Sequence, residues 1–457
     1  MKLIIYRTNV ILEGMTPKVK NLIDRVTRFK PNDSEWWSKV RSGAHDGVIH
    51  LMRHGSFPIG LLDDVIQMLE IYEIKYTIKD TRRYPTYQRV ELSSDIVLRE
   101  YQKEAVSFAL MNQRGVISLP TGSGKTIIAL EIAKRLQLPM IFFVNRKELL
   151  YQTVGFIKSV FGEDAGMIGD GKMDLKPLTV AMIQTATGLP ASLFIEFGLC
   201  FFDEVHHVPA NTVYNVASKI ECPYVFGLSA TPFREDGRDL QIGAAIGPII
   251  YKETLSSLIH KGFLAKPHIC AIPVSPITFG RKDKYADVYR RAVMFNKERN
   301  EKIAAIAVDA SVQGSTYIHV RRIDHGKILA KMIKSITRYE SGKRVEFLCG
   351  KDKTKTRAEV LKKFKSGNLP ILISTLLGEG FDCPDMVNMI LATPIKSRSA
   401  TQQAFGRLLR ISECNFVTYY DCFDNCKYLR DHWLARVKFY RSEEEFILDD
   451  RIKNLPI

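Results

Sequence analysis

The 457-residue chain lacks any apolar run of the roughly 18–20 residues that crossing a bilayer requires, so we expect no membrane association. Its opening stretch, MKLIIYRTNVILEG, has no small-residue cleavage site and is interrupted early by charge, which favours a strand pair over a secretory signal. Internal repeats and low-complexity segments are also missing. With 46% hydrophobic and 25% charged residues, the composition is typical of a globular protein with room for about three domains.

Cysteine is present but unpatterned. The eight cysteines are scattered and form no CxxC pair, which favours reduced thiols in a cytoplasm over a disulfide framework. Cys414, Cys422, Cys426 and His432 form one loose cluster, but their spacing matches no zinc pattern. We therefore expect ordinary free cysteines there rather than a metal site.

Positive charge is in excess. The net charge is +16, and residues 316–368 alone hold 15 Lys/Arg against 5 Asp/Glu. A basic surface can serve solubility alone, but an excess of this size favours a polyanionic partner. The charge predicts nucleic acid without saying which kind.

Residues 1–90 are predicted to form a small α/β domain. KLIIY and NVILEG read as short strands, and the following helical pattern has Thr16 as its N-cap. GVIHLMRHGSFPIG, residues 47–60, is predicted to be a hairpin. TRRYPTYQRVELS, residues 81–93, is polar and contains proline, so we interpret it as a linker.

From about residue 91 the pattern changes to short apolar runs that alternate with helical stretches. This alternation is the signature of a parallel sheet with crossover helices. It occurs twice, which predicts two α/β domains in series, at residues 91–255 and 256–457.

The stretch LPTGSGKTIIALEIAK, residues 119–134, predicts a phosphate-binding turn. An apolar strand enters the turn and a helix-forming run leaves it, so backbone N–H groups point at phosphate oxygens. Leu119 stands where the P-loop pattern asks for glycine, which leaves the match incomplete. The turn itself comprises Pro120, Thr121, Gly122, Ser123 and Gly124, followed by Lys125 for the β/γ-phosphates and Thr126 for Mg²⁺.

Two further segments point to the same site. LCFFDEVHH delivers Asp203 and Glu204 at the end of an apolar strand, where one carboxylate can serve a metal while its neighbour polarises water. GLSATPFRED places the hydroxyl groups of Ser229 and Thr231 after another apolar strand. Adjacent acids at a strand end are often only solvated, but the phosphate-binding turn favours the functional interpretation.

QQAFGRLLR carries Arg407 and Arg410, which lie three residues apart and share one face if the segment is helical. Guanidinium groups can stabilise the charge of a transferring phosphoryl group. Taken alone, two such arginines are usually a solvated helix face, and only the other ATP-site segments favour a role in hydrolysis.

Taken in order, LREYQKEAV, PTGSGKT, DEVH, SATP, STLLGEGFD and QQAFGRLLR resemble the superfamily 2 helicases of the DExH branch. The resemblance spans residues 98–410. It implies two tandem RecA-like domains that clamp ATP and Mg²⁺ between them and pass nucleic acid across their common face.

The resemblance also assigns roles to single residues. Arg99 and Gln102 would bind the nucleotide, with Gln102 reading adenine, and Gly380 and Asp382 would lie beside it or couple it to the nucleic acid. The remaining assignments are Thr126 and Asp203 for Mg²⁺, Glu204 as catalytic base, and Arg407 and Arg410 as arginine fingers.

Within the superfamily the chain is similar to the phage branch-migration helicases of the UvsW type, which carry a small α/β domain ahead of the motor domains. His45 stands where that family has tryptophan, and Trp36–Trp37 lie earlier. The resemblance further implies that Arg146 in VNRKELLYQ, followed by Thr185 in IQTATG, contacts the nucleic-acid backbone. An ordinary strand-to-helix turn is the alternative for each.

These observations predict an ATP-dependent DNA helicase or translocase that unwinds or branch-migrates forked and four-way-junction DNA in recombination, repair or replication. We expect it to bind branched, duplex and single-stranded DNA as a cytoplasmic monomer. An RNA helicase or a duplex translocase that does not unwind remains an alternative, because the ATP-site motifs are shared. An ATP-gated binding scaffold is disfavoured, because a scaffold does not need the full set of catalytic residues.

Overall fold

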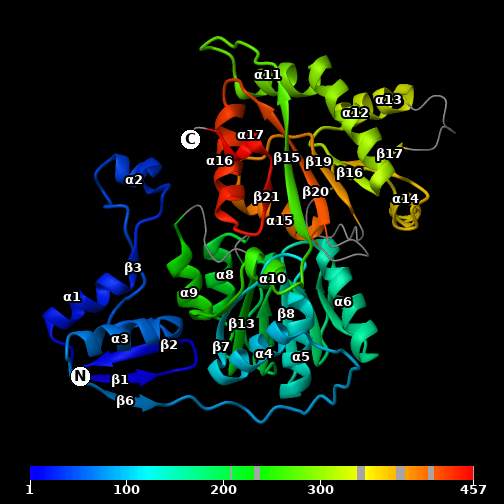
Figure 1. Ribbon diagram of the computed structural model, residues 1–457. Helices are drawn as coiled ribbons and strands as arrows, with labels where there is room; N and C mark the ends of the chain where they lie inside the picture. Colours follow the sequence, from blue (N-terminus) through cyan, green and yellow to red (C-terminus); the bar gives the residue numbers. More distant parts are fainter. Residues whose placement is uncertain (206–207, 231–236, 337–344, 377–385, 410–415, 456–457) are drawn as a thin grey trace. The chain divides into compact units, whose positions relative to one another are not determined.

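The computed structural model divides by its internal contacts into two units, residues 1–119 with 124–252, and residues 120–123 with 253–457 (Figure 1). None of its described helices combines the length and apolar character that crossing a bilayer requires. The structure describes all residues except 206–207, 231–236, 337–344, 377–385, 410–415 and 456–457, and of Trp36, Thr354, Arg398, Ser399, Gln403 and Arg407 it describes the backbone only.

The first unit begins with a four-stranded sheet in the order β5-β2-β1-β6. The predicted strand pair is confirmed, since β1 and β2 are antiparallel neighbours. Thr16 caps the first helix as predicted, because its Oγ1 accepts a hydrogen bond from Val19 N at 3.4 Å. The elements are β1 (Lys2–Ile5), β2 (Asn9–Glu13), α1 (Pro17–Val26), β5 (Ser56–Pro58), α3 (Leu62–Ile71) and β6 (Thr77–Asp80).

The predicted hairpin at residues 47–60 is wrong. Its first strand, β4 (Ile49–His50), pairs with β3 (Arg28–Phe29), whereas its second strand, β5, pairs with β2. Only an isolated bridge between Arg53 and Ser56 joins the two halves. Pairing with β2 places Phe57 in the core of the larger sheet, which a local hairpin would not do.

This N-terminal sheet packs against helix α9 (Asp239–Ile246) of the same unit. Ala244 of α9 belongs to the apolar core beneath the N-terminal sheet. Gly60 makes the closest approach, because a Cβ built on it would lie 2.2 Å from Gly243 O and 2.6 Å from Ala244 O. Only glycine fits at this contact.

We therefore expect Gly60→Ala to lower the free energy of unfolding of the first unit by about 1–3 kcal/mol, because the added methyl group forces two backbones apart. Gly243→Ala is the matched control, since a Cβ at Gly243 meets nothing within 4 Å. Urea unfolding, followed by the fluorescence of Trp36 and Trp37, measures the difference. Equal midpoints for the two variants would contradict the tight contact.

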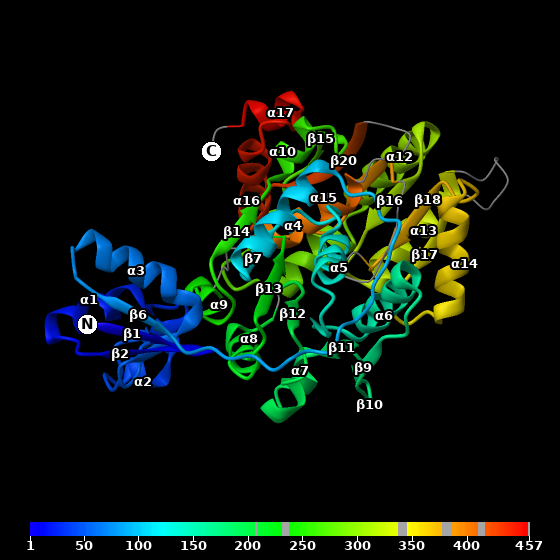
Figure 2. The same cartoon turned by 90° about the horizontal axis from the view of Figure 1, so that it is seen from below.

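Residues 81–99 run without helix or strand along the first unit (Figure 2). Val90 N donates to Gln137 O at 3.0 Å, and Lys134 Nζ donates to Ser94 O at 3.0 Å. Leu92 between them is buried. This connection is therefore fixed to the end of α5 (Lys125–Leu136) rather than hanging free.

The larger sheet of the first unit has the order β10-β9-β11-β8-β12-β13-β7-β14, and all its strands are parallel except β10. Helices α8 and α9 cover one face, and α4 and α5 lie on the other (Figures 1 and 2). The strands are β7 (Arg114–Ser118), β8 (Met140–Val144), β9 (Gly166–Gly169), β10 (Lys172–Asp174), β11 (Leu178–Met182), β12 (Leu199–Phe202), β13 (Tyr224–Ser229) and β14 (Ile249–Lys252), and the further helices are α4 (Glu100–Asn112), α6 (Lys147–Phe161), α7 (Ile183–Ala186) and α8 (Ala210–Ala217).

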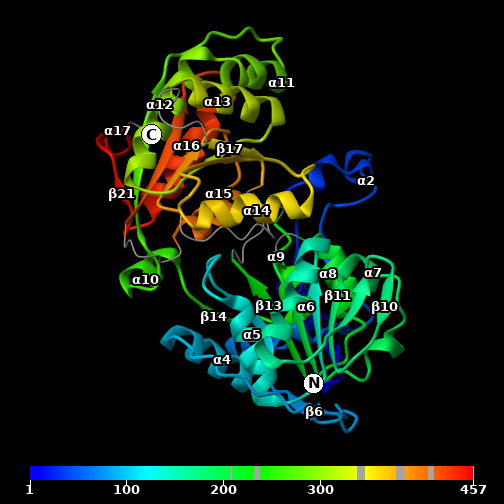
Figure 3. The ribbon, with the colours of Figure 1, turned by 90° about the vertical axis from the view of Figure 1, so that its right-hand side faces the viewer.

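The second unit contains a fully parallel seven-stranded sheet in the order β17-β18-β16-β19-β20-β15-β21 (Figure 3). The predicted pair of α/β folds with parallel sheets is thus confirmed. Its elements are β15 (Lys266–Val274), α12 (Lys297–Gln313), β16 (Thr316–His319), α13 (Ile323–Ile336), β17 (Val345–Leu348), α14 (Thr354–Lys365), β18 (Ile371–Ser374), β19 (Asn388–Leu391), α15 (Arg398–Leu408), β20 (Phe416–Asp424), α16 (Leu429–Ser442) and β21 (Ile447–Leu448).

Candidate ATP and nucleic-acid sites

The predicted phosphate-binding turn lies at the carboxyl end of β7, directly before α5. Gly122 and Gly124 have φ values of +86° and +82°, a region that favours glycine. Lys125 is the first residue of α5, so the unpaired N–H groups of the helix start lie beside its ammonium group. Backbone donors and a cation are thus combined, as an anion site requires.

Leu119 accounts for the incomplete P-loop pattern. Its side chain is buried in the core, and its φ is not among the positive values of the chain. Leu119 N donates to Ser229 O at 2.8 Å, which continues the pairing of β7 with β13. The position directly follows β7, has no positive φ and does not need glycine.

Gln102 lies against this turn. Its Nε2 would be 2.6 Å from a Cβ on Gly124, so the amide occupies the space that a side chain would need. Its Oε1 accepts a hydrogen bond from Arg99 N at 2.9 Å, which orients the amide at the start of α4. Arg99 and Gln102 are therefore brought to the glycine turn from a separate helix.

The predicted carboxylates follow β12. Asp203 N donates to Phe143 O of the neighbouring strand at 2.9 Å, and Glu204 N donates to Asp203 Oδ1 at 3.0 Å. Glu204 has a φ of +46°, which is uncommon for a residue other than glycine and occurs at functional sites. The sharp turn directs its carboxylate back toward the glycine turn.

Lys125 and Glu204 meet in a nearly buried ion pair. Lys125 Nζ lies 3.3 Å from Glu204 Oε1, and the two side chains are only 8% and 11% exposed. Lys125 Nζ also donates to Leu119 O at 3.2 Å. A charge pair shielded from water in this way interacts more strongly than one on the surface.

Thr126 and Asp203 are the residues predicted to hold Mg²⁺. A hydroxyl and a carboxylate oxygen are the hard donors that this ion prefers. Within the described ranges, no three His, Cys, Asp or Glu side chains form a metal cluster.

The SATP segment begins at the end of β13. Ser229 is buried, whereas Thr231 lies outside the described residues. The chain that follows reaches the N-terminal sheet region, since Arg238 Nη2 lies 3.4 Å from Asp33 Oδ1 and its guanidinium carbon 5.7 Å from the ring of Trp37. This contact joins the segment beyond SATP to the N-terminal residues.

Arg146 caps α6 at the carboxyl end of β8 and is exposed, and Thr185 lies in α7 after β11. The two segments are in contact, because Gln184 Nε2 donates to Asn145 O at 3.0 Å. The sequence did not single out this glutamine or this asparagine, and no motif spacing signals the contact. Together they form an edge at the ends of two adjacent strands.

A basic group extends this edge. Lys147 Nζ lies 2.7 Å from Asp170 Oδ1, and Tyr151 OH donates to Asp170 Oδ2 at 2.7 Å. The hydrogen bond from Lys147, followed by that from Tyr151, lowers the pKa of Asp170 below its usual value. Lys172 lies over the ring of Tyr151, so several cations surround a single carboxylate.

The predicted arginine fingers lie in the second unit. Helix α15 is anchored by Phe405, whose ring centroid is 4.3 Å from that of Tyr419 on β20. The helix ends at Leu408, so Arg407 belongs to its last turn. Arg410, Gly380 and Asp382 lie outside the described residues, so the predicted shared helix face of the two arginines stays a prediction.

In the basic segment RRIDHGKILAKMI, Arg321 and Arg322 follow β16 and are exposed. His325, by contrast, is buried in α13, where burial lowers its pKa to about 3 and keeps the ring neutral. Its Nε2 lies 2.9 Å from Asn300 Oδ1. His325 is therefore a core residue, whereas Arg321 and Arg322 at the strand end, and Lys327 and Lys331 on α13, face solvent.

The loose cysteine cluster behaves as free thiols in the described part of the chain. Burial raises the pKa of Cys422 to about 12 and that of Cys426 to about 11, so neither is a thiolate at neutral pH. Cys414 lies outside the described residues.

Two family descriptions match the chain. Residues 95–234 match "Type III restriction enzyme, res subunit", and residues 298–412 match "Helicase conserved C-terminal domain". Together the two matches cover more than half of the 457 residues.

Several relatives are similar over most of the chain. The DNA 3'-5' translocase XPB2 of Sulfurisphaera tokodaii is 27% identical, covering 74% of this chain and 87% of that protein. The ATP-dependent DNA helicase uvsW of Enterobacteria phage T4 is 24% identical, covering 91% of both. Of three further relatives the chain spans only 55–62% of their length.

Among solved structures, a fragment of a putative HsdR subunit of a type I restriction enzyme from Vibrio vulnificus YJ016 aligns with a TM-score of 0.55. The identity is 22%, and the alignment covers 73% of this chain and 65% of that one. This likeness shows a shared fold.

Proposed function

The chain belongs to the superfamily 2 helicases, which are ATP-using enzymes of the DNA helicase and translocase class. We propose that it uses ATP hydrolysis to remodel branched DNA. The observation that carries the proposal is the arrangement of two adjacent strands. Asp203 and Glu204 directly follow strand β12, Arg146 follows the end of strand β8, and Asp203 N donates to Phe143 O of β8. We propose that a structural change at the nucleotide is transmitted through this hydrogen bond to the edge that carries Arg146 and Thr185.

In the proposed reaction, Lys125 and the N–H groups at the start of α5 bind the β/γ-phosphates of ATP. Glu204 accepts a proton from the attacking water, since its carboxylate lies beside Lys125 at the same edge of the sheet. Gln102 and Arg99 orient the nucleotide base from α4. Thr126 and Asp203 would hold Mg²⁺, which would supply charge neutralisation at the phosphates.

We further propose that Arg407 and Arg410 act as arginine fingers, and that Gly380 and Asp382 lie near the nucleotide. Arginine suits the finger role because its planar guanidinium matches phosphate oxygens with two parallel hydrogen bonds. The anchoring of α15 by Phe405 supports it, because a finger needs a rigid base.

We propose that Arg146 and Thr185 contact the DNA backbone on the first unit, and that the exposed Arg321 and Arg322 do so on the second. The net charge of +16 supports sequence-independent binding to phosphates, which weakens as salt rises. DNA rather than RNA is favoured by the relatives, which include a DNA translocase and a DNA helicase.

Branched DNA is proposed as the substrate because residues 1–90 form a separate sheet that is firmly joined to the first motor sheet. The contacts of Arg238 with Asp33 and Trp37 link the segment beyond SATP to residues of the N-terminal part of the chain. We propose that the N-terminal residues bind a duplex arm. Through this contact they would respond to ATP binding and hydrolysis. The relative named ATP-dependent DNA helicase uvsW, similar over 91% of this chain, supports DNA as the substrate.

Steady-state ATP hydrolysis tests the proposal at fixed salt with no nucleic acid, single-stranded DNA, duplex DNA, a four-way junction and single-stranded RNA. We expect the junction to stimulate most. Stimulation by RNA alone would favour an RNA helicase. Equal stimulation by the duplex and the junction would favour a translocase that does not remodel branches.

Arg146→Ala should raise the DNA concentration that gives half-maximal stimulation and reduce its salt dependence by about one released counterion, with basal hydrolysis unchanged. Lys158→Ala is the control, since Lys158 lies on α6 as well but pairs with Asp164 at 3.1 Å. If both variants respond to DNA like the parent protein, Arg146 does not contact the backbone.

A further inference from the structure

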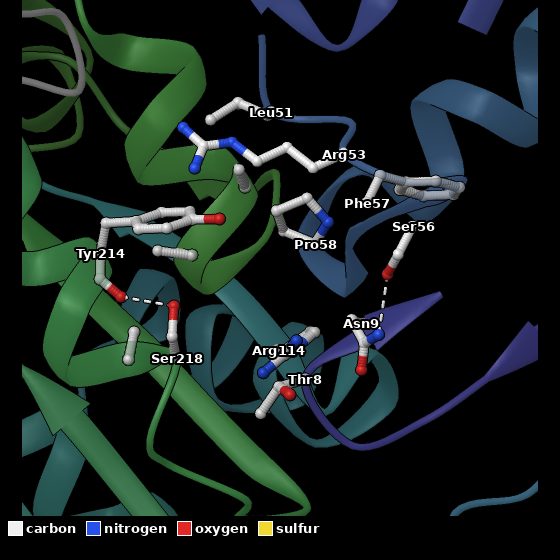
Figure 4. A pocket seen from close by; sticks show the side chains of 13 residues that line it. Thr8, Asn9, Leu51, Arg53, Ser56, Phe57, Pro58, Arg114, Tyr214 and Ser218 are labelled. Atoms are coloured by element: carbon white, nitrogen blue, oxygen red, sulfur yellow. Dashed lines mark hydrogen bonds between the residues drawn. The ribbon is translucent and has the colours of Figure 1, made fainter. Parts of the chain in front are cut away.

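A pocket of about 230 Å³ opens between the N-terminal sheet and the first motor sheet (Figure 4). Its walls come from the turn before β5, from the start of β7, and from α8 and α9. It lies at the amino end of β7, whereas the phosphate-binding turn follows the carboxyl end of the same strand. The pocket is therefore distinct from the proposed ATP site.

Arg114 is the unusual member of this pocket. Its Nη1 is buried and has no hydrogen-bond partner among the described residues. Burial lowers the pKa of Arg114 to about 10, so the guanidinium still carries its charge at neutral pH. The groups that act most strongly on this charge are Tyr84, Arg82, Cys200 and Cys222, and none of them is a carboxylate.

A second arginine reaches the same pocket. Arg53 projects from the turn before β5 and lies near Tyr214 of α8 (Figure 4). Burial raises the pKa of the Tyr214 phenol, and the charge of Arg53 opposes that rise. The remaining polar lining is neutral, with Asn9 Nδ2 bonded to Ser56 Oγ at 2.8 Å. No acidic side chain lines the pocket in the described part of the chain.

Neighbouring arginines show how this region normally balances charge. Arg7 pairs with Glu221, and Arg82 makes three hydrogen bonds to Asp80. Both flank a smaller cavity that Arg114 also borders. Arg114 is thus left without a carboxylate in a place where its neighbours have one. Arg114 as a whole is only partly buried, but its Nη1 is shielded from water without a partner, and the resulting cost in stability is one that a bound anion would offset.

We propose that this pocket binds a phosphate group, with Arg114 at its buried wall and Arg53 at its outer wall. Guanidinium groups match phosphate oxygens through paired hydrogen bonds, and the neutral amide and hydroxyl groups supply further polar contacts. At about 230 Å³ the pocket is smaller than the roughly 300–1,000 Å³ of typical ligand sites. It therefore takes a phosphate with a small part of its carrier, which is either a nucleic-acid backbone or a free phosphorylated molecule.

Thermal unfolding in phosphate and in chloride at equal ionic strength tests the site without DNA or ATP. Phosphate should raise the Tm of the parent protein by about 3 °C more than the Tm of Arg114→Met. Any binding at the Lys125 turn is common to both proteins and cancels. In chloride, Arg114→Met should be at least as stable as the parent, because it removes an uncompensated buried charge. Equal phosphate responses would overturn the proposal.

Two further variants serve as controls for the comparison between the parent protein and Arg114→Met. Arg53→Met changes an exposed side chain, so it should fold normally and also lose the extra response to phosphate. Arg25→Met, on the exposed face of α1 and away from the pocket, should keep that response. A loss in all three variants would show a general charge effect and overturn the site.

Duplex DNA then distinguishes the two carriers. If the phosphate belongs to the DNA backbone, the slope of log affinity against log salt should shrink by about one in Arg114→Met. An unchanged slope with a lost phosphate response assigns the pocket to a free phosphorylated molecule. The first measurement uses inorganic phosphate alone, so its result tests the phosphate site independently of the proposed branch remodelling.

Discussion

Replacing Lys125 with alanine should lower the rate of ATP hydrolysis by about 10²–10³-fold, the cost of losing one charged stabiliser of the transition state. The Lys125 ammonium group lies at the start of α5 and 3.3 Å from Glu204 Oε1. Its partner in this ion pair is a carboxylate, which cannot replace the lost positive charge. DNA affinity should change little, because the proposed contacts lie at the ends of other strands. Hydrolysis rate and DNA affinity are measured on the same preparation.

The variant also leaves the nearly buried Glu204 carboxylate without its cation, which destabilises the fold. Its unfolding temperature must therefore be recorded beside the rate. Lys158→Ala, on the surface of the same unit, controls for loss of one positive charge. Normal turnover by a folded Lys125→Ala protein would remove the phosphate role from this lysine.

Glu204→Gln should reduce kcat by about 10²–10⁴-fold, because the amide keeps the shape of the side chain but cannot accept the proton. ATP binding should survive, since Lys125 and the helix start remain, and it should tighten if repulsion between the carboxylate and the phosphates is relieved. Single-turnover hydrolysis and equilibrium nucleotide binding separate the two effects.

Glu196→Gln removes an exposed carboxylate just before β12 and provides the control. It should hydrolyse ATP like the parent protein. If Glu204→Gln also retains its kcat, the base lies elsewhere, and the positive φ of Glu204 has only a structural meaning.

The sequence predicts the motor folds well because each signal is local. Apolar strands such as LCFFDE and the glycine turn before Lys125 need only neighbouring residues to be recognised, and the structure places them at the same edge of one sheet. Leu119 broke the textual pattern, yet it lies buried directly after β7 without a positive φ, so the position does not need glycine.

Contacts between segments that are distant in the sequence cannot be predicted from such local patterns. The hairpin predicted at residues 47–60 failed because β4 and β5 find partners outside it, in β3 and β2. Nothing in RGVISLP marks Arg114 as unusual, since its missing counter-charge appears only when the N-terminal sheet packs beside it. The placement of Gln102 against Gly124 likewise joins two segments that no local pattern connects.

The close packing of Gly60 on α9 changes how the N-terminal residues should be tested. Deleting residues 1–90 would expose Ala244 and the apolar core around it, so lost activity would be ambiguous. Substitutions that leave this contact intact, such as Arg53→Met, separate DNA recognition from folding.

The central claim is tested most directly by branch migration of a labelled four-way junction with homologous arms. The parent protein should convert the junction to duplex products in an ATP-dependent manner, and Glu204→Gln should bind the junction without converting it. If the parent protein hydrolyses ATP on the junction yet leaves it intact, the chain is a DNA-dependent ATPase but not a branch-remodelling motor.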